Sequence, residues 1–401
     1  MKTLVVDNGA ASIRANFSGA DNPIVIPNTI YKFRSEKRRV FVADEIEDYN
    51  DKTKVYYSLA HEKGYLVNWN VEYEVWDRLF GPDKLNVDFE DTRLLLTDIN
   101  SIVPAFKDNV EEIVFESYQF NALNKTAAAN LVAQHSLTQR NKQSCIVVDS
   151  GFSFTHILPY YDGGLISNSI VRLDIGGKAL TNQLKEWISY RQLEVRDETY
   201  IMNQCKEDLC FVSTDFNKDM KVAELRYSEG NTVMRDYLLP DFVNFDKGEA
   251  ALPSREPTDR QKIVVNTERF TVPELLFNPS DVGLKQAGIP EAVAQCITEV
   301  AVSFPDIALG LPSNIICVGG NAAIPGFVNR LQNDLQQWCT HGTDLVCTKP
   351  ESPTRYAWDC GRDLVRKKDT MIEDGFISQS DYFEHGDAIF YRKMGNNFFS
   401  Y

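Results

Sequence analysis

Two stretches of this chain carry residues that could bind a phosphorylated ligand. The longer one, residues 145–156, reads CIVVDSGFSFTH, an apolar run that ends in an acid, a hydroxyl and a glycine. The pattern predicts a buried strand, a tight turn and a second strand, with the Asp149 carboxylate at the tip of the first strand. Backbone N–H groups in such a turn can cradle phosphate, and the carboxylate can hold the hydrated metal that accompanies phosphates. Ordinary strand-ending turns have the same composition, so this stretch alone is a weak signal.

The same plan recurs near the N-terminus, where residues 4–12 read LVVDNGAAS and Asp7 takes the place of Asp149. An internal repeat reports architecture. Two related halves would bring their phosphate turns face to face across a cleft. This arrangement resembles that of the sugar kinase, heat-shock chaperone and actin superfamily, in which a nucleotide binds between the halves.

Length and composition indicate an ordinary globular protein. A chain of 401 residues is expected to form two or more domains, and 43% hydrophobic with 25% charged residues is typical of soluble proteins. The net charge of −15 disfavours broad nucleic-acid binding, which needs Lys and Arg against phosphates. A local basic patch on an acidic body stays compatible with the composition.

The eight cysteines are scattered and form no Cys-x-x-Cys pair, so the sequence disfavours a zinc site. Several lie in apolar runs, as in 315–318, where reduced core cysteines of a reducing compartment are expected. The apolar run at 4–6 is too short for a signal peptide or a membrane span. We therefore expect a protein of the nucleus or cytoplasm.

Strand and helix patterns alternate along the chain, which predicts α/β layers. Apolar residues at helical spacing predict a helix over 71–80, and a buried strand is expected at 93–98. Further helices are expected at 51–61, 110–117, 126–134, 179–190, 199–211 and 289–301.

Glycine pairs follow two predicted strands, one at Gly176 and Gly177 and the other at Gly319 and Gly320. Such a pair lets a ligand approach the backbone closely, although a simple turn explains it equally well. Residues 242–261 contain proline, glycine and charge without periodicity, so we expect an exposed insertion there. The most basic stretch, 34–39, is either a solvated loop or a contact with nucleic acid or an acidic partner.

These motifs occur together in the order and spacing of actin, over nearly the whole chain. They are VDNG at 6–9, VDSG at 148–151 followed by TH, RLD at 172–174, KEDLC at 206–210, VGG at 318–320 and RK at 392–393. The chain resembles an actin-related protein more than actin itself. Residues 64–69, 176–185 and 276–283 look most like the sixth nuclear subfamily, a subunit of the chromatin remodeller that exchanges a variant histone into nucleosomes.

The resemblance implies an α/β fold of the duplicated actin-like ATPase type, with two domains, each of two subdomains, flanking a nucleotide cleft. Residues 1–139 with 357–401 would form the first half, and 30–65 its small outer subdomain. Residues 140–356 would form the second half, with 176–284 as the outer subdomain.

The resemblance also implies a set of cofactor residues for ATP or ADP with Mg²⁺. Asp7 and Asp149 would lie near the metal. The phosphates would meet Asn8, Gly9, Ser150 and Gly151. The adenosine would lie between Lys206 and Glu207, with Gly177, Gly319 and Gly320 lining its pocket. The aliphatic stem of Lys206 can cover a base, and Glu207 can accept from ribose hydroxyls.

Several departures from actin argue against fast hydrolysis. Phe152 stands where actin has an Asp, and Gly9-Ala10-Ala11 replaces Gly-Ser-Gly. Actin's water-orienting glutamine has no match in 125–131, where Asn130 is nearest. His156 matches the second water-orienting residue and is a weak catalytic candidate, or a satisfied core histidine. The short basic segment 35–39 replaces the loop that links actin protomers in filaments.

Three functions fit these observations to different degrees. The first is a structural, nucleotide-binding subunit with little hydrolysis, docked on a remodeller ATPase and accessory subunits and reaching nucleosomal DNA only indirectly. It would need no membrane and form no filaments. The alternative is an active ATPase or a polymerising actin-like cytoskeletal protein. A sugar or acetate kinase is disfavoured, because no motif for a second substrate pocket is found.

Overall fold

The computed structural model describes residues 1–33, 39–49, 52–101, 109–253, 259–338 and 344–394. Its first half is built on a sheet in the order β20-β10-β9-β1-β2-β3. The hairpin of β1 and β2 is antiparallel and pairs Asp7 with Arg14, while β1 and β9 are parallel and pair Val6 with Leu96. The strands are β1 (Lys2–Asn8), β2 (Ser12–Phe17), β3 (Ile24–Pro27), β9 (Thr92–Thr97), β10 (Ala122–Thr126) and β20 (Ile377–Ser378).

The second half repeats this plan in the order β13-β12-β11-β18-β19, with β14 also paired to β12. The β11–β12 hairpin is antiparallel and pairs Asp149 with His156, and β11 is parallel to β18, where Asp149 faces Val318. The predicted duplication and α/β class are confirmed. The strands are β11 (Ser144–Ser150), β12 (Thr155–Tyr161), β13 (Gly164–Leu165), β14 (Val171–Leu173), β18 (Ile315–Val318) and β19 (Cys347–Thr348).

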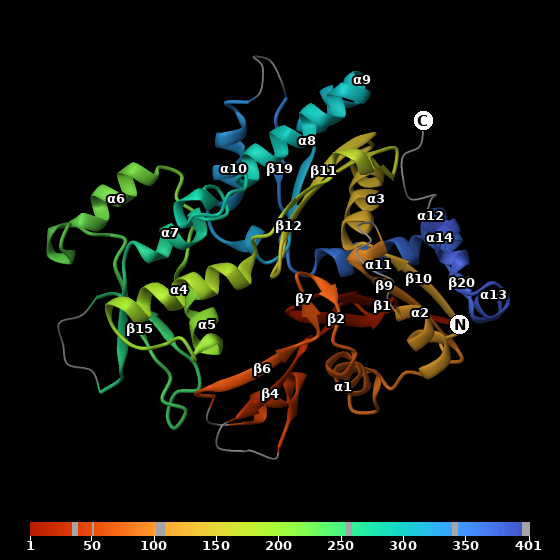
Figure 1. Ribbon diagram of the computed structural model, residues 1–401, viewed down its shortest axis with the longest axis horizontal. Coiled ribbons are helices and arrows are strands. Elements are labelled where there is room, and N and C mark those ends of the chain that lie inside the picture. The colour runs from red at the N-terminus through yellow and green to blue at the C-terminus, as the bar shows by residue number, and fades with distance from the viewer. Residues whose placement is uncertain (34–38, 50–51, 102–108, 254–258, 339–343, 395–401) are drawn as a thin grey trace.

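Two helices, α3 (Ala128–Arg140) and α11 (Tyr356–Lys367), pack against each other between the sheets (Figure 1). Their apolar faces join side chains from both sheets in one buried cluster that includes Val5, Leu131, Val147 and Trp358. The Trp358 indole N–H donates to the Val5 carbonyl at 3.1 Å. The chain thus returns to the first half after completing the second, and the two halves share a core.

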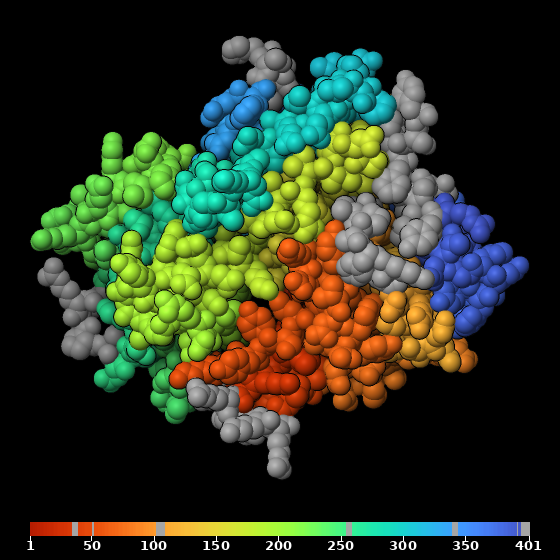
Figure 2. Space-filling view, viewed as in Figure 1, coloured from red at the N-terminus to blue at the C-terminus, as the bar shows by residue number. Residues whose placement is uncertain are grey.

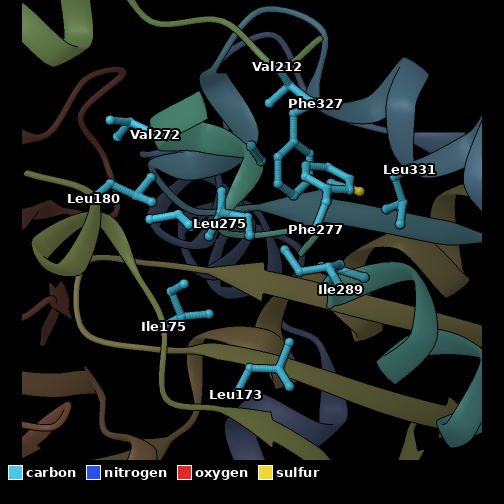
Figure 3. Packing of buried hydrophobic residues seen from close by; sticks show 14 of the residues in the cluster. Leu173, Ile175, Leu180, Val212, Val272, Leu275, Phe277, Ile289, Phe327 and Leu331 are labelled. Atoms are coloured by element: carbon cyan, nitrogen blue, oxygen red, sulfur yellow. The ribbon is translucent and has the colours of Figure 1, made fainter. Parts of the chain in front are cut away.

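The second half has its own large core around β12 and β18 (Figure 3). Phe277 and Phe327 lie with ring centroids 5.6 Å apart, and Ile289 and Leu331 pack beside them. The helices of this half are α4 (Gly177–Arg191), α5 (Thr199–Leu209), α6 (Phe216–Glu224), α7 (Glu268–Glu274), α8 (Ile289–Ser303), α9 (Pro305–Gly310) and α10 (Phe327–Leu335).

The first half is covered mainly by α1 (Trp69–Phe80), which buries Val75, Trp76 and Leu79. Predicted helices at 71–80 and 110–117 are confirmed, the latter as α2 (Val110–Glu112) continued by a π-helix (Ile113–Ser117). The C-terminal helices pack beside β10 and β20 (Figure 1). They are α12 (Thr370–Gly375), α13 (Gln379–His385) and α14 (Ala388–Met394).

Each half carries a small outer sheet. In the first half it has the order β5-β4-β6, from β5 (Phe41–Val42), β4 (Thr29–Phe33) and β6 (Val55–Leu59), and is followed by a hairpin of β7 (His61–Glu62) and β8 (Tyr65–Leu66). In the second half it has the order β16-β15-β17, from β16 (Glu249–Ala251), β15 (Arg235–Leu238) and β17 (Lys262–Val265). The domain boundaries drawn from the sequence stay a prediction.

The helix expected at 51–61 is wrong, because residues 55–59 form β6 and residue 61 begins β7; residue 51 lies outside the described residues. Along β6, Val55 is buried while Tyr56 and Ser58 are exposed, which is the alternation of a strand paired to β4. Tertiary pairing overrides the polar helical composition here.

The insertion predicted at 242–261 is only partly irregular, since β16 lies within it and pairs with β15. Residues 254–258 of the insertion and 34–38 of the basic stretch lie outside the described residues. Arg39 lies over the Phe41 ring, 4.4 Å from its centroid. No described helix is both long enough and apolar enough to cross a membrane.

Candidate functional site

A cavity of about 350 Å³ lies where the two hairpins face each other, and both halves line it. This volume falls in the range of small-molecule sites. Every residue predicted to hold the cofactor lies along it except Ser150. The lining includes Asp7, Asn8, Gly9, Ala10, Ala11 and Thr97 from the first half, and Asp149, Gly151, Phe152, Ser153, Phe154, Gly177, Lys206, Glu207, Gly319, Gly320 and Asn321 from the second.

Asp7 lies near the end of β1, and the residue is only 8% exposed. The Thr97 hydroxyl donates to Asp7 Oδ1 at 3.0 Å, and Arg14 Nη1 lies 3.7 Å from Oδ2. Burial raises the pKa of Asp7, and Arg14 and Thr97 oppose that rise. The β1–β2 pairing puts Arg14 directly opposite Asp7, so the hairpin itself supplies the counter-charge.

Asp149 occupies the matching position at the end of β11. Burial raises the pKa of Asp149 to about 6, and the Asp7 carboxylate adds to the rise. Both acids line the same cavity, one from each half, as the repeat predicts. Two carboxylates that resist ionising together form a site that a cation stabilises.

The backbone of the first turn is tightly folded. A Cβ atom at Gly9 would lie 2.8 Å from the Ser12 carbonyl oxygen, so only glycine fits this position without a shift. The Asn8 N–H donates to Thr97 Oγ1 at 2.9 Å, and the Asn8 carboxamide donates to Glu72 Oε1 at 2.6 Å. The Asn8 side chain is therefore tied to α1 and its backbone N–H to Thr97, so Asn8 shapes the turn that lines the cavity.

The second turn is anchored from behind by Asn321. Its carboxamide donates to Ser150 Oγ at 3.0 Å and to the Gly151 carbonyl at 2.9 Å. The Ser150 hydroxyl is fully buried and also bonds to Thr155 Oγ1 at 2.8 Å. The structure thus places the Ser150 side chain inside the turn and away from the cavity, where it shapes the loop without facing a phosphate.

Gly177 begins α4 at the back of the cavity, with its N–H donating to the Gly151 carbonyl at 3.0 Å. Lys206 Nζ is bonded to the Gly177 carbonyl at 3.2 Å, to Thr181 Oγ1 at 2.9 Å and to Asn203 Oδ1 at 2.9 Å. Burial lowers the pKa of Lys206. The ammonium is thus occupied by α4 and α5, which leaves the aliphatic stem as the surface that a base would contact.

Glu207 follows Lys206 on α5, and Asn203 Nδ2 donates to its Oε1 at 2.8 Å. Gly319 has a positive φ of 89°, and a Cβ atom there would collide with the Ser150 carbonyl. Nothing lies within 4 Å of a Cβ built on Gly320. The glycine pair after β18 therefore packs one residue under the second turn and leaves the other open to the cavity.

A contact across the cleft joins the β7–β8 hairpin to the second half. We call Lys63, Gly64, Phe154 and Arg172 the cross-cleft contact. A side chain at Gly64, whose φ is 86°, would collide with the Phe154 ring. The Arg172 guanidinium lies 4.7 Å from the centroid of that ring, and Arg172 Nη2 donates to the Lys63 carbonyl at 2.7 Å.

The outer parts of the two halves also meet, as the boundary between the red-orange and yellow-green regions shows (Figure 2). The Lys54 N–H donates to Glu198 Oε2 at 3.2 Å, and Lys52 Nζ lies 5.9 Å from the centroid of the Tyr200 ring. Protein contacts therefore join the outer parts of the two halves as well as the hairpin at the cleft.

Neither candidate for orienting an attacking water faces the cavity. His156 is fully buried, packs on Phe154 with ring centroids 4.2 Å apart, and does not line the cavity. Burial, together with the Arg172 charge, lowers the pKa of His156 to about 3. Asn130 is buried as well; its Nδ2 donates to Thr126 Oγ1 at 3.1 Å, and its Oδ1 accepts from the Tyr160 hydroxyl at 2.7 Å.

The donor set fits a nucleotide with one hydrated Mg²⁺. Mg²⁺ usually binds one or two carboxylates together with phosphates and water, and Asp7 with Asp149 supply that number. No group of three or more His, Cys, Asp or Glu side chains in the described part of the chain could hold a metal by itself. A metal here would depend on the phosphates that arrive with it.

Sequence reasoning missed four residues that build the site. Thr97 and Asn321 position the turns, Phe154 closes the cleft, and Glu72 holds Asn8. Thr97 ends β9, the strand parallel to β1, and Asn321 directly follows the glycine pair after β18, so both lie near strand ends that meet at the cavity. Glu72 is an acid on the apolar face of a predicted helix, a pattern that signals a buried polar contact.

Comparison with known proteins gives a consistent answer. The actin family model matches residues 1–395. An actin-related protein 6 of Drosophila melanogaster is 41% identical over 395 residues, covering 96% of this chain and 97% of the relative. An actin-like protein of Caenorhabditis elegans, C08B11.6, is 40% identical over 392 residues, covering 97% and 91%. The actin-related protein 6 of Dictyostelium discoideum is 30% identical over 460 residues, covering 96% and 92%.

Proposed function

The chain belongs to the actin family, and we propose that it is a structural, nucleotide-binding subunit of a nuclear chromatin-remodelling complex. The complex would be one that exchanges a variant histone into nucleosomes. ATP or ADP with Mg²⁺ would bind between the two halves and stabilise the closed molecule by mass action, with little hydrolysis.

One observation supports the nucleotide part above all others. Asp7 and Asp149 come from duplicated strand tips 142 positions apart in the chain, and both line one cavity of about 350 Å³. Burial and mutual repulsion raise the pKa of Asp149, so the empty site is electrostatically unfavourable. A bound cation would relieve that repulsion, which favours a metal-nucleotide ligand over a neutral one.

Slow hydrolysis is supported by the positions of the residues that would have to act on water. His156 is buried behind Phe154, and both polar ends of Asn130 are engaged in the core. Phe152 lines the cavity where actin has an acid. An aromatic ring there provides no ligand for the water shell of the metal, so the attacking water would lack both a positioning group and a base.

The subunit role is supported by the resemblance to the sixth nuclear subfamily and by the relatives named actin-related protein 6. A member of that subfamily would dock on the remodeller ATPase and its accessory subunits, and would contact nucleosomal DNA through them. The stretch 34–39 and the insertion at 242–261 are the proposed contact segments. Filament assembly and membrane binding are not part of this proposal.

The nucleotide proposal is tested on the purified full-length protein. Native mass spectrometry should detect one ATP or ADP per chain, and added nucleotide with Mg²⁺ should raise the melting temperature. At a concentration 100 times Kd the stabilisation is about 2.7 kcal/mol. Single-turnover hydrolysis should be far slower than that of filament-forming actin, measured in parallel. Turnover at the actin rate, or pelleting above a critical concentration, would support an active or polymerising actin instead.

The complex proposal needs a separate test in cells. A tagged copy expressed at its natural level should be found in the nucleus and co-purify with a remodeller ATPase. Its depletion should reduce the variant histone at promoters while total histone stays constant. A cytoplasmic distribution with unchanged histone content would refute this part of the proposal and leave the nucleotide part standing.

A further inference from the structure

Glu72 is an acid in an apolar position. It lies on the buried face of α1 beside Val75 and Trp76, and its side chain is 0% exposed. No ion pair among the described residues includes it, and the nearest cation on its helix, Arg78, is paired with Asp44 at 2.6 Å. A buried carboxylate without a cation is costly, so the position requires an explanation.

The contacts of Glu72 all come from uncharged amide and indole groups around the first phosphate turn. Asn8 Nδ2 donates to Glu72 Oε1 at 2.6 Å, and the side chains of Asn28 and Trp76 also lie against the carboxyl group. Glu72 Oε2 and Asn28 Oδ1 are both buried and have no hydrogen-bond partner. Glu72 and Asn28 thus carry one buried acceptor each without a donor, and a single proton between them would satisfy both.

We propose that Glu72 is held as a neutral carboxylic acid whose proton joins it to Asn28, and that this pair positions the first phosphate turn. The proton on Oε2 supplies the missing donor, while Oε1 continues to accept from Asn8. Glu72 would then act as a positioning residue, because it touches Asn8 and Asn28 and lies outside the lining of the cavity. Only the expected effect of Glu72 on nucleotide affinity rests on the proposed function; its protonation state does not.

The electrostatic surroundings agree with a neutral acid. Burial raises the pKa of Glu72 to about 7, although the neighbouring side chains of Asn8, Asn28 and Trp76 act in the opposite direction. No Lys, Arg or His of the described chain is paired with Glu72. Tyr118 has its own pKa raised, in small part by Glu72, and Asp7 precedes Asn8 on β1. On α1 itself, Glu74 and Asp77 are exposed.

The network reaches the backbone of the turn from two sides. Asn28, which joins β3 to β4, donates from Nδ2 to the Gly9 carbonyl at 3.2 Å. Asn8 donates its backbone N–H to Thr97, and Thr97 donates to Asp7. A proton at Glu72 therefore fixes two consecutive residues of the turn and, through Thr97, the carboxylate that would face the metal.

The sign of the pH effect follows from the raised pKa. The folded protein takes up a proton that the unfolded chain releases near pH 4.5, so the contribution of Glu72 to stability falls as the pH rises from about 4.5 to about 7. Glu72→Gln keeps the shape and donates from Nε2 without titrating. The melting temperature of this variant minus that of the wild type should be near zero at pH 4, should rise between about pH 4.5 and about pH 7, and should level off by pH 8.

Two controls make the test specific. Glu74→Gln makes the same change on the exposed face of α1 and should leave the melting temperature unchanged at every pH. Glu72→Leu removes the bonds to Asn8 and Asn28, should lower the melting temperature at all pH values, and should raise the Kd for Mg²⁺-ADP about tenfold. An infrared band of a protonated carboxylic acid, present in the wild type and lost in Glu72→Gln, would identify the proton directly.

A difference between Glu72→Gln and wild type that does not change with pH would overturn the proposal, as would a glutamine variant as damaged as the leucine variant. The stability and infrared measurements use the protein without nucleotide. If the wild type failed to bind Mg²⁺-ADP, the proposed function would fail while these two measurements still decided the state of Glu72.

Discussion

At the scale of single residues, the two strand-tip acids form a site that lowers the stability of the protein without ligand. Asp149 is buried opposite Asp7, and both acids have raised pKa values. Natural proteins carry such unfavourable charges mainly where a ligand compensates them. Glu72 differs from these two acids, because it lies outside the cavity lining, where a cation could bind, and contacts only uncharged side chains.

Asp149→Asn should therefore have opposite effects with and without ligand. Because the folded pKa of Asp149 is raised to about 6, its ionised form destabilises the folded state above that pH. The variant without nucleotide should melt at a higher temperature than the wild type at pH 8, by on the order of 2–3 kcal/mol in the free energy of unfolding. Stabilisation by Mg²⁺-ATP should disappear.

Calorimetry at pH 8 with and without Mg²⁺-ATP measures both effects. The difference between variant and wild type should shrink as the pH falls towards 4, where both proteins are neutral at this position. An asparagine variant that still responds fully to Mg²⁺-ATP would mean that Asp149 does not face the metal.

At the scale of elements, the β7–β8 hairpin decides how the cleft is closed. Its turn residue Gly64 adopts a φ of 86° and lies against Phe154 from the other half. Glycine is needed here for two separate reasons, the left-handed backbone and the absence of a side chain. Arg172 adds a hydrogen bond from the second half to the Lys63 carbonyl.

Gly64→Ala should lower the free energy of unfolding by more than backbone strain alone. Gly283 provides the matched control, since its φ is 80° and nothing lies within 4 Å of a Cβ built there. Gly283→Ala should cost about 1 kcal/mol from backbone strain. Gly64→Ala should cost at least about twice as much, and hydrogen exchange should become faster in β7 and β8.

Adding Phe154→Ala to Gly64→Ala should recover part of this excess, because it removes the ring with which the new methyl group collides. Gly64→Ala, Phe154→Ala and the double variant, measured with the wild type, form a double-mutant cycle with a favourable coupling energy. Equal costs for Gly64→Ala and Gly283→Ala would show that the cross-cleft contact contributes nothing.

At the scale of the whole molecule, one buried cluster connects the halves. Residues from α3, α11 and both central sheets meet in it, and Trp358 ties the returning chain to Val5 of the first strand. A Cβ at Gly361 on the same helix would lie 3.1 Å from Val5 Cγ1 and 3.2 Å from Leu131 Cδ1. The helix therefore packs directly on the sheet, and the two halves should unfold together.

Trp358→Phe should lower the free energy of unfolding by about 2–4 kcal/mol, because it leaves a cavity and removes the indole hydrogen bond to the Val5 carbonyl. Thermal unfolding of the variant should remain a single transition when followed by near-UV circular dichroism and by calorimetry. Two separate transitions would mean that the halves are independent domains joined only by the chain.

The sequence by itself determined the strand tips, the duplication and the family, because an apolar run ending in Asp and Gly is a local pattern that needs no distant partner. It also placed Asp7, Asp149, Gly177 and Lys206 on the elements that line the cavity. The helix expected at 51–61 failed because pairing with β4 outweighed local composition.

Only the tertiary structure decided what those residues touch. Asn8 meets Glu72 across 64 positions, and Asn321 meets Ser150 across 171, so no local pattern could reveal either bond. Asn321 and Thr155 hold the Ser150 hydroxyl inside its turn, and the packing of Phe154 on His156 buries the histidine. Spacing specifies which backbone segments form a turn, but packing between distant segments decides which side chains remain free to meet a ligand.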